Sequence, residues 1–94
     1  MTFEWDENKN KQNQVKHGID FNDAKEVFDD MNRTNSQDNR HDYGEKRWIT
    51  IGLVANVLIT VVYTIREAIR IISARRSNKN ERQEYTKNQT NNGN

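Results

Sequence analysis

The stretch RWITIGLVANVLITVVYTIREAIRIISARR, residues 47–76, decides the fold class of this chain. It contains three runs rich in β-branched residues, at 47–53, 57–64 and 68–74, separated by very short connections. Such runs are typical of strands, and such short connections are typical of hairpins. The stretch therefore predicts an antiparallel meander, whose middle strand is apolar on both faces as a central strand should be.

Two helices are predicted before the sheet from their capping residues. Asp6 can cap a polar helix over 7–16, and Gly18 can end that helix in the left-handed conformation. Asp20 can cap a second helix, whose apolar side chains recur at helical spacing: Phe21, Ala24, Val27 and Phe28. That apolar face predicts a helix packed on the sheet, whereas the polar first helix should lie on the surface or against a partner.

The remaining segments are polar. Residues 31–36 could add an edge strand, and Asn56 is the expected left-handed residue of the hairpin at 54–57. After the sheet, Ser77 or Asn78 can cap a basic helix to about Tyr85, with Glu81 at the capping-box position for Asn78. The predicted fold is thus α+β, with one domain over 1–86 and a disordered Asn-rich tail over 87–94.

Composition narrows the class of protein. The chain has 94 residues and no cysteine, which excludes a disulfide framework and a thiolate zinc site and suits a reducing cytoplasm. Arg66, Glu67 and Arg70 interrupt the apolar middle, which argues against a membrane span. Residues 1–45 carry six Lys and Arg against eleven Asp and Glu, whereas residues 46–94 carry nine against three. One pole of the molecule should therefore attract anions and the other cations.

Read in order, four pieces of the chain resemble the BrnT family of toxins from bacterial type II toxin–antitoxin pairs. They are Phe3-Glu4-Trp5-Asp6-Glu7-Asn8-Lys9, Lys16-His17-Gly18-Ile19 with Phe21 and Ala24, Val27-Phe28-Asp29-Asp30, and the block from Asp42-Tyr43-Gly44-Glu45 to Ile69-Arg70-Ile71-Ile72-Ser73-Ala74-Arg75. The chain departs from the family at Met31, where proline is usual, and after Arg66, where a glycine is usual and the loop looks one residue short.

The resemblance implies a fold and a function. The fold would be RelE-like, with two N-terminal helices packed on an antiparallel sheet and a C-terminal helix. The activity would be ribonuclease cleavage that inhibits translation and growth. The partners would be RNA as substrate and a BrnA-like antitoxin in a heterotetramer, which neutralises the toxin and alone contacts the operator DNA.

Cleavage of RNA without a metal ion needs a base, an acid and cations around the phosphate. No carboxylate–histidine cluster has metal-ligand spacing, so neither a metal nor another cofactor is predicted. The candidate catalytic residues are His17, Arg66, Arg70, Lys9 and Tyr63, and the candidate RNA-binding residues are Lys16, Arg75, Arg76 and Arg82. Arg70 has the strongest claim, because an arginine between two isoleucines of a strand needs an anionic partner or water.

Each of these residues also has a structural interpretation. Arg70 could form an ion pair with an acidic residue of the first two helices, and His17 could simply interact with a helix dipole. Lys9 and Lys16 could belong to a solvated face, and Tyr63 could be a packing residue. A second class of function also fits: a non-catalytic toxin or co-repressor that binds a protein target, as ParE-like relatives do.

Overall fold

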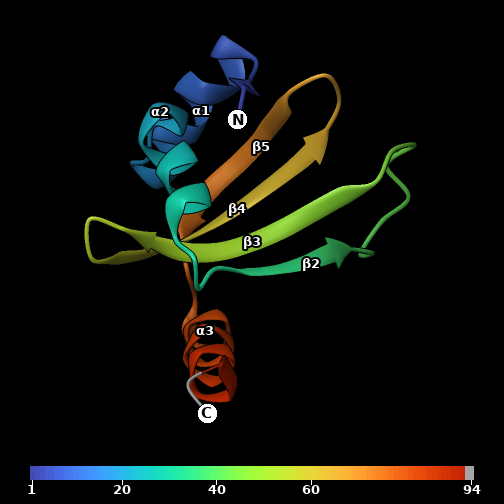
Figure 1. Ribbon diagram of the computed structural model, residues 1–94. Helices are drawn as coiled ribbons and strands as arrows, with labels where there is room; N and C mark the ends of the chain where they lie inside the picture. The colour runs from blue at the N-terminus through green and yellow to red at the C-terminus, as the bar shows by residue number, and fades with distance from the viewer. Residues whose placement is uncertain (93–94) are drawn as a thin grey trace.

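The computed structural model describes residues 1–92, which form a five-stranded sheet with helices at both of its ends (Figure 1). The elements, in chain order, are β1 (Phe3–Glu4), α1 (Glu7–His17), α2 (Phe21–Ala24), η1 (Lys25–Asp29), β2 (Thr34–Asp38), β3 (Arg47–Val54), β4 (Val57–Ile65), β5 (Ile69–Arg76) and α3 (Lys79–Asn92). The α+β class, the two N-terminal helical segments and the C-terminal helix are confirmed. No helix among the described residues is long and apolar enough to cross a membrane.

The sheet has the order β1-β5-β4-β3-β2 and is mixed. Strands β2 to β5 run antiparallel, as predicted, but β1 pairs with β5 in parallel, with Phe3 opposite Ile69. The prediction of a wholly antiparallel sheet is therefore wrong at this edge. The Phe3 ring lies 5.3 Å from the Phe28 ring, so packing of the aromatic side chain on the core fixes the first strand there.

The predicted caps and turns are confirmed. The Asp6 carboxylate accepts hydrogen bonds from the first amides of α1, and Gly18 ends that helix at a φ of 71°. Asp20 caps α2 through the amide of Asn22. In the β3–β4 hairpin both Ala55 and Asn56 have positive φ, at 49° and 67°, which is the two-residue turn that matches the twist of the strands.

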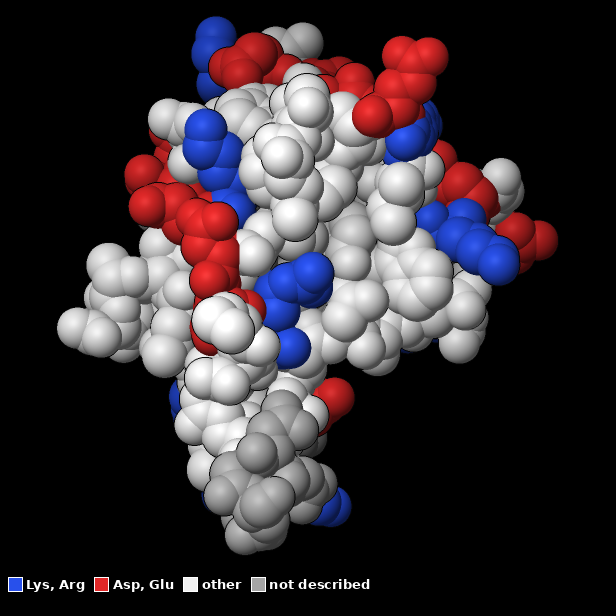
Figure 2. Space-filling view, viewed as in Figure 1, with Lys and Arg blue, Asp and Glu red and all other residues white. Residues whose placement is uncertain are grey.

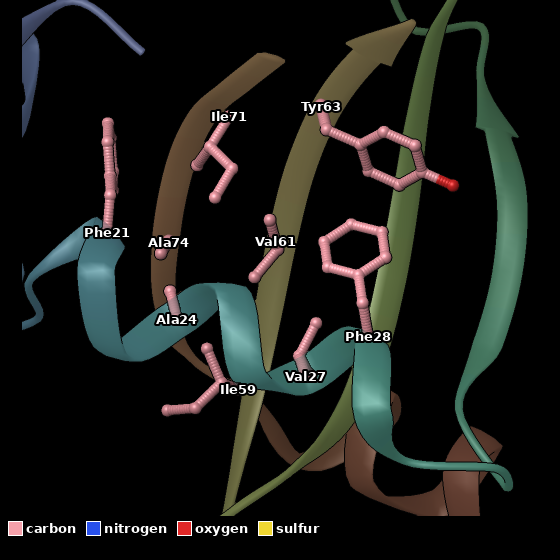
Figure 3. Packing of buried hydrophobic residues seen from close by; sticks show 9 residues of the cluster. All are labelled: Phe21, Ala24, Val27, Phe28, Ile59, Val61, Tyr63, Ile71 and Ala74. Carbon is pink, nitrogen blue, oxygen red and sulfur yellow. The ribbon is translucent and has the colours of Figure 1, made fainter. Parts of the chain in front are cut away.

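The core lies between the sheet and the segment α2–η1. The second predicted helix is divided here, because its last turn tightens into the 3₁₀ helix η1. Its apolar residues nevertheless face the sheet as expected, and they pack on side chains of β4 and β5 (Figure 3): Phe21, Ala24, Val27 and Phe28 on Ile59, Val61, Tyr63, Ile71 and Ala74. Gly52 allows the close approach, since a Cβ there would lie 2.8 Å from a methyl group of Val27.

Helix α1 is held by asparagines and not by an apolar face. Asn13 accepts a hydrogen bond from the amide of Ala74 and donates to the carbonyl oxygens of Ala74 and Ile19. Asn10 accepts from the amide of Phe21 and donates to Asp20. Val15, the one clearly apolar residue of the helix, is 91% exposed. Polar side chains thus dock a polar helix on β5, which hydropathy patterns do not reveal.

Helix α3 begins with the predicted capping box, in which Asn78 and Glu81 bond each other's backbone amides. The helix continues to Asn92, beyond its expected end near Tyr85, so residues 87–92 of the predicted tail are helical and residues 93–94 lie outside the described part. The Tyr85 hydroxyl donates to Asp30 at 2.6 Å, and the same carboxylate accepts from the amide of Leu53. These two bonds tie α3 to the sheet.

Candidate nucleic-acid interface

The two faces of the sheet differ in what packs against them. The segment α2–η1 covers the face that carries Val61 and Tyr63. On the opposite face, Ile49 and Val62 lie across from each other on β3 and β4, and both stay partly exposed. We call this second face, with Arg47, Ile49, Val62, Arg70 and Arg75, the open face. Arginines, which bind phosphates and stack on bases, are common in surfaces that hold single-stranded RNA.

A β-bulge brings Arg70 and Arg75 to the same face. Arg70 lies opposite Thr64 and Arg75 opposite Thr60, and residues four apart on a regular strand project from the same side. Strand β5 has one residue more than β4 between these pairs, because Val62 pairs with Ser73 while Tyr63 pairs with Ile71. In a regular strand without this bulge, residues five apart would lie on opposite faces, so Arg70 and Arg75 would be separated.

The Arg70 guanidinium lies 3.5 Å from the Glu4 carboxylate, its neighbour on β1. An ion pair was one of the two interpretations of this residue, with a partner expected from the first two helices. The actual partner comes from β1 and is 40% exposed, while the Arg70 side chain is 28% exposed. A pair so open to water constrains Arg70 only weakly and leaves the guanidinium within reach of a phosphate.

Arg75 is held more firmly. Its two terminal nitrogens donate to both carboxylate oxygens of Glu81, at 2.6 and 2.7 Å. Burial works to raise the pKa of Glu81, but the hydrogen bonds from Arg75 and from the amide of Asn78 outweigh it, so the pKa is lowered. The hydrogen bonds to Glu81 raise the pKa of Arg75. The first turn of α3 therefore orients a charged guanidinium on the open face.

Besides Arg70 and Arg75, two further arginines lie at the open face, Arg40 and Arg47, and neither was predicted from the sequence. Arg40 donates through its Nε and a terminal nitrogen to Asp38, at 2.8 and 2.9 Å, and the Tyr43 hydroxyl donates to the same carboxylate. The Arg47 guanidinium lies 4.0 Å from the centre of the Tyr43 ring. The charge of Arg40 works to lower the pKa of Arg75, against the larger effect of the hydrogen bonds to Glu81. Arg47 could have been found from its alternation with Ile49, but Arg40 and Tyr43 lie in a loop without a periodic signal.

Arg66 lies at the turn between β4 and β5, where its guanidinium bonds Glu45 at 3.1 Å. Glu45 also bonds Arg47, at 3.4 Å, so one carboxylate bridges the turn arginine to the open face. The pKa of Glu45 is lowered, mainly by the hydrogen bond from Arg66. The short loop thus leaves Arg66 near the open face, with a side chain that is 53% exposed.

The other candidate residues lie elsewhere. Tyr63 is in the core, on the face opposite Arg70, and its hydroxyl donates to Asn35 at 2.5 Å. Lys9 and Lys16 are exposed on α1, and Arg82 on α3 donates to the carbonyl oxygen of Ser77. The structure therefore brings Arg66, Arg70 and Arg75 towards one face but does not place Tyr63 there.

His17 and Arg76 line one cavity of about 390 Å³ on the helix-covered side of the sheet. His17 is the last residue of α1, and Arg76 is the last residue of β5, opposite Ile59. Sequence spacing could not predict this meeting, since nearly sixty residues separate them. Within residues 1–92, no group of three or more His, Cys, Asp or Glu could hold a metal ion.

Comparison with protein families matches residues 5–81 to the ribonuclease toxin BrnT of type II toxin–antitoxin systems. The chain belongs to this family. The comparison with curated proteins gave no match. As a BrnT-family member the chain is one half of a toxin–antitoxin pair, and its partner is an antitoxin.

The BrnT match covers most of the geometry described above. It includes α1 from Glu7 to His17, strands β2 to β5, and the Arg75–Glu81 pair, whereas β1 precedes the matched residues. Arg82 and the rest of α3 follow the matched residues. The open face and the cavity that His17 and Arg76 line therefore both lie inside the region that this chain shares with BrnT toxins.

Proposed function

We propose that this BrnT-family chain, with a fold of the RelE and ParE kind, is an endoribonuclease that cleaves RNA without a metal ion and thereby inhibits translation and growth. One observation carries the proposal: Arg70 and Arg75 project from the same open face. The partly exposed side chains of Ile49 on β3 and Val62 on β4 lie on that face as well. Two guanidinium groups on one surface can hold the phosphates of a single strand and stack on its bases.

The chemistry would follow the simplest route for RNA. A base removes the proton of a 2′-hydroxyl, the resulting oxygen attacks the adjacent phosphorus, and the bond to the 5′-oxygen breaks as that oxygen gains a proton. Arg70 would bind the scissile phosphate, and Arg75 and Arg66 would stabilise the added negative charge. The ion pairs with Glu4, Glu81 and Glu45 would exchange part of their bonding for the phosphate when RNA binds. Tyr63 has no role in this chemistry.

A second arrangement has an observation of its own in favour. His17 carries an imidazole, a side chain that commonly transfers protons, and it lines a cavity together with Arg76. In that arrangement His17 would move the proton, Arg76 would bind the phosphate, and Lys9, Lys16 and Arg82 would hold flanking phosphates. Arg70→Ala and His17→Gln separate the two: the variant that loses single-turnover rate while keeping its affinity for RNA marks the site of chemistry.

The decisive experiment incubates the purified chain with a defined RNA in EDTA. Cleavage should continue and leave 2′,3′-cyclic phosphate ends, with Arg70→Ala as the inactive control. Loss of cleavage in EDTA, restored by magnesium, would overturn metal independence. Growth arrest by a protein that never cuts RNA would favour the second function, a non-catalytic toxin or co-repressor acting on a protein target.

The antitoxin would be BrnA-like, would form a heterotetramer with the toxin and would carry all contacts to operator DNA. The polar, exposed outer surface of α1 supports a protein partner, because this helix has no apolar face of its own. Co-expression should abolish toxicity, and the purified complex should bury on the order of 2,000 Å² or more. Toxicity that persists with the adjacent gene expressed would contradict this part of the proposal.

A further inference from the structure

The cavity that His17 and Arg76 line contains an unusual set of charged groups. Asp23 of α2 and Glu26 of η1 also line it, so one guanidinium, one imidazole and two carboxylates share the space. Within the described residues, none of these four side chains takes part in a hydrogen bond or ion pair. This contrasts with the arginines of the open face, each of which has a carboxylate partner. The cavity thus offers donors and acceptors that the fold does not use.

The rest of the cavity wall is apolar. It is formed by Ile19 before α2, Ala24 of α2, and residues of the β3–β4 hairpin and β4, including Val54 and Ile59. Figure 3 shows Ala24 and Ile59 together at one end of the core cluster, where the cavity adjoins the packed interior. Figure 2 shows acidic side chains along the side of the molecule that α2 and η1 occupy in Figure 1, with others at the top and right. A flat, apolar ligand with polar edges would meet both parts of this wall.

From this set of groups we infer that the cavity is a nucleobase-binding subsite with a preference for guanine; the inference rests on the proposed RNA cleavage. Guanine has two adjacent acceptors, O6 and N7, which a guanidinium binds with two hydrogen bonds. Its other edge has the N1–H and N2–H donors, and a carboxylate can accept hydrogen bonds from both. Arg76 meets the first requirement, and Glu26 or Asp23 meets the second. Adenine and uracil lack this combination of two adjacent acceptors and two adjacent donors.

The strand that carries Arg76 also connects the cavity to the open face. Arg75 and Arg76 are consecutive on β5 and project from its two opposite faces. Strand β1 pairs with β5 only at Ile69 and Arg70, and Asn13 of α1 bonds the edge at Ala74, so within residues 1–92 no strand pairs with the edge of β5 at Arg75 and Arg76. An RNA strand that crosses this edge places a phosphate at Arg75 and an unstacked base at Arg76. Unstacked bases of single strands are what RNA-binding proteins read most often.

The experiment measures binding of the four nucleoside 5′-monophosphates to the full chain by NMR titration. GMP should bind roughly ten- to a hundredfold more tightly than AMP, CMP or UMP, the usual discrimination of a bidentate base contact. Glu26→Gln and Arg76→Ala should each lose most of that preference. The matched control is Asp29→Asn, an exposed carboxylate of the same segment outside this cavity, which should keep it. Melting temperatures of all variants establish that they fold.

A second readout is the position of cleavage in a defined RNA of mixed sequence. The wild type should cut next to guanines, and in Glu26→Gln the ratio of cutting at guanine to cutting elsewhere should fall. Equal binding of all four nucleotides, or a preference that survives both cavity variants, would overturn the subsite. RNA cut without base preference and without GMP binding removes the subsite and leaves the ribonuclease. GMP binding without any cleavage removes the ribonuclease and leaves the subsite.

Discussion

Arg70 and Arg75 lie five residues apart on β5 and project from the same face of the sheet, because the bulge at Ile72 shifts the alternation of the strand by one residue. Each is paired with a carboxylate from a different element, Glu4 of β1 for the first and Glu81 of α3 for the second. The pairs differ in exposure and geometry, so the two arginines should respond differently to substitution.

Arg70→Ala should lower kcat by about two to three orders of magnitude, the usual loss for a charge-stabilising donor. The melting temperature should hardly change, because the pair with Glu4 is exposed and such pairs contribute at most about 1 kcal/mol. Arg70→Lys should recover only part of the rate, since an ammonium group lacks the planar fork. Glu4→Gln is the matched control for the loss of the pair. An Arg70 variant that melts early, and cuts normally while folded, would assign the residue to stability alone.

Glu81→Gln should lower kcat roughly ten- to a hundredfold with little change in KM, because it releases the orientation of Arg75. Glu81 would then be a positioning residue. Glu81→Asp should have a similarly low kcat, since the shorter side chain cannot reach both the Arg75 guanidinium and the Asn78 amide. The control is Glu84→Gln, an exposed carboxylate one turn along α3. A normal kcat in Glu81→Gln would show that Arg75 needs no such support.

Asp38 should make the protein less stable in acid. The hydrogen bonds from Arg40 hold the pKa of this buried carboxyl well below its ordinary value of 3.8. Since the folded-state pKa is depressed, the stabilisation is fully present above the unfolded pKa, near pH 4, and is lost as the pH falls further. Urea melts at a series of pH values should show this loss, and Asp38→Asn should reduce the slope below pH 4. An unchanged slope would mean that other carboxyls dominate acid unfolding.

Asn13→Ala should destabilise the protein by about 1–3 kcal/mol, because it leaves the buried amide of Ala74 without a partner on that edge of β5. The control is Gln14→Ala, the next residue of α1, whose side chain is exposed. Chemical denaturation measures the difference between the two. Equal stability of both variants would show that α1 is docked by other contacts.

Tyr63→Phe should lower stability by about 0.5–1.5 kcal/mol, through loss of the hydrogen bond to Asn35, and leave kcat unchanged. The ring itself stays in its edge-on contact with Phe28, 5.0 Å between centres, so the core should not collapse. Thermal melts and single-turnover kinetics on the same preparation test both expectations. A large loss of kcat at a normal melting temperature would place Tyr63 in the chemistry.

The sequence by itself determined where most helices and strands of this protein begin and which residues form its core. Local signals lie within a few residues of each other, so Asp6, Asp20 and Asn56 were sufficient to predict two helix starts and a hairpin. Hydrophobic spacing likewise predicted the core from Phe21 to Phe28, because burial of one face is encoded in the period of the helix. The family resemblance predicted the toxin class, which the match over residues 5–81 confirms.

Only the tertiary structure decided which residues share a face. The bulge at Ile72 arises from the pairing of β5 with β4, and no local sequence pattern predicts it. A prediction from strict alternation would therefore have placed Arg70 and Arg75 on opposite faces. The parallel edge strand and the cavity between His17 and Arg76 likewise depend on contacts across more than fifty residues of chain. A sequence pattern reflects the periodicity of a single helix or strand. A functional site depends on how helices and strands are aligned with one another, and this alignment is fixed only when the core packs.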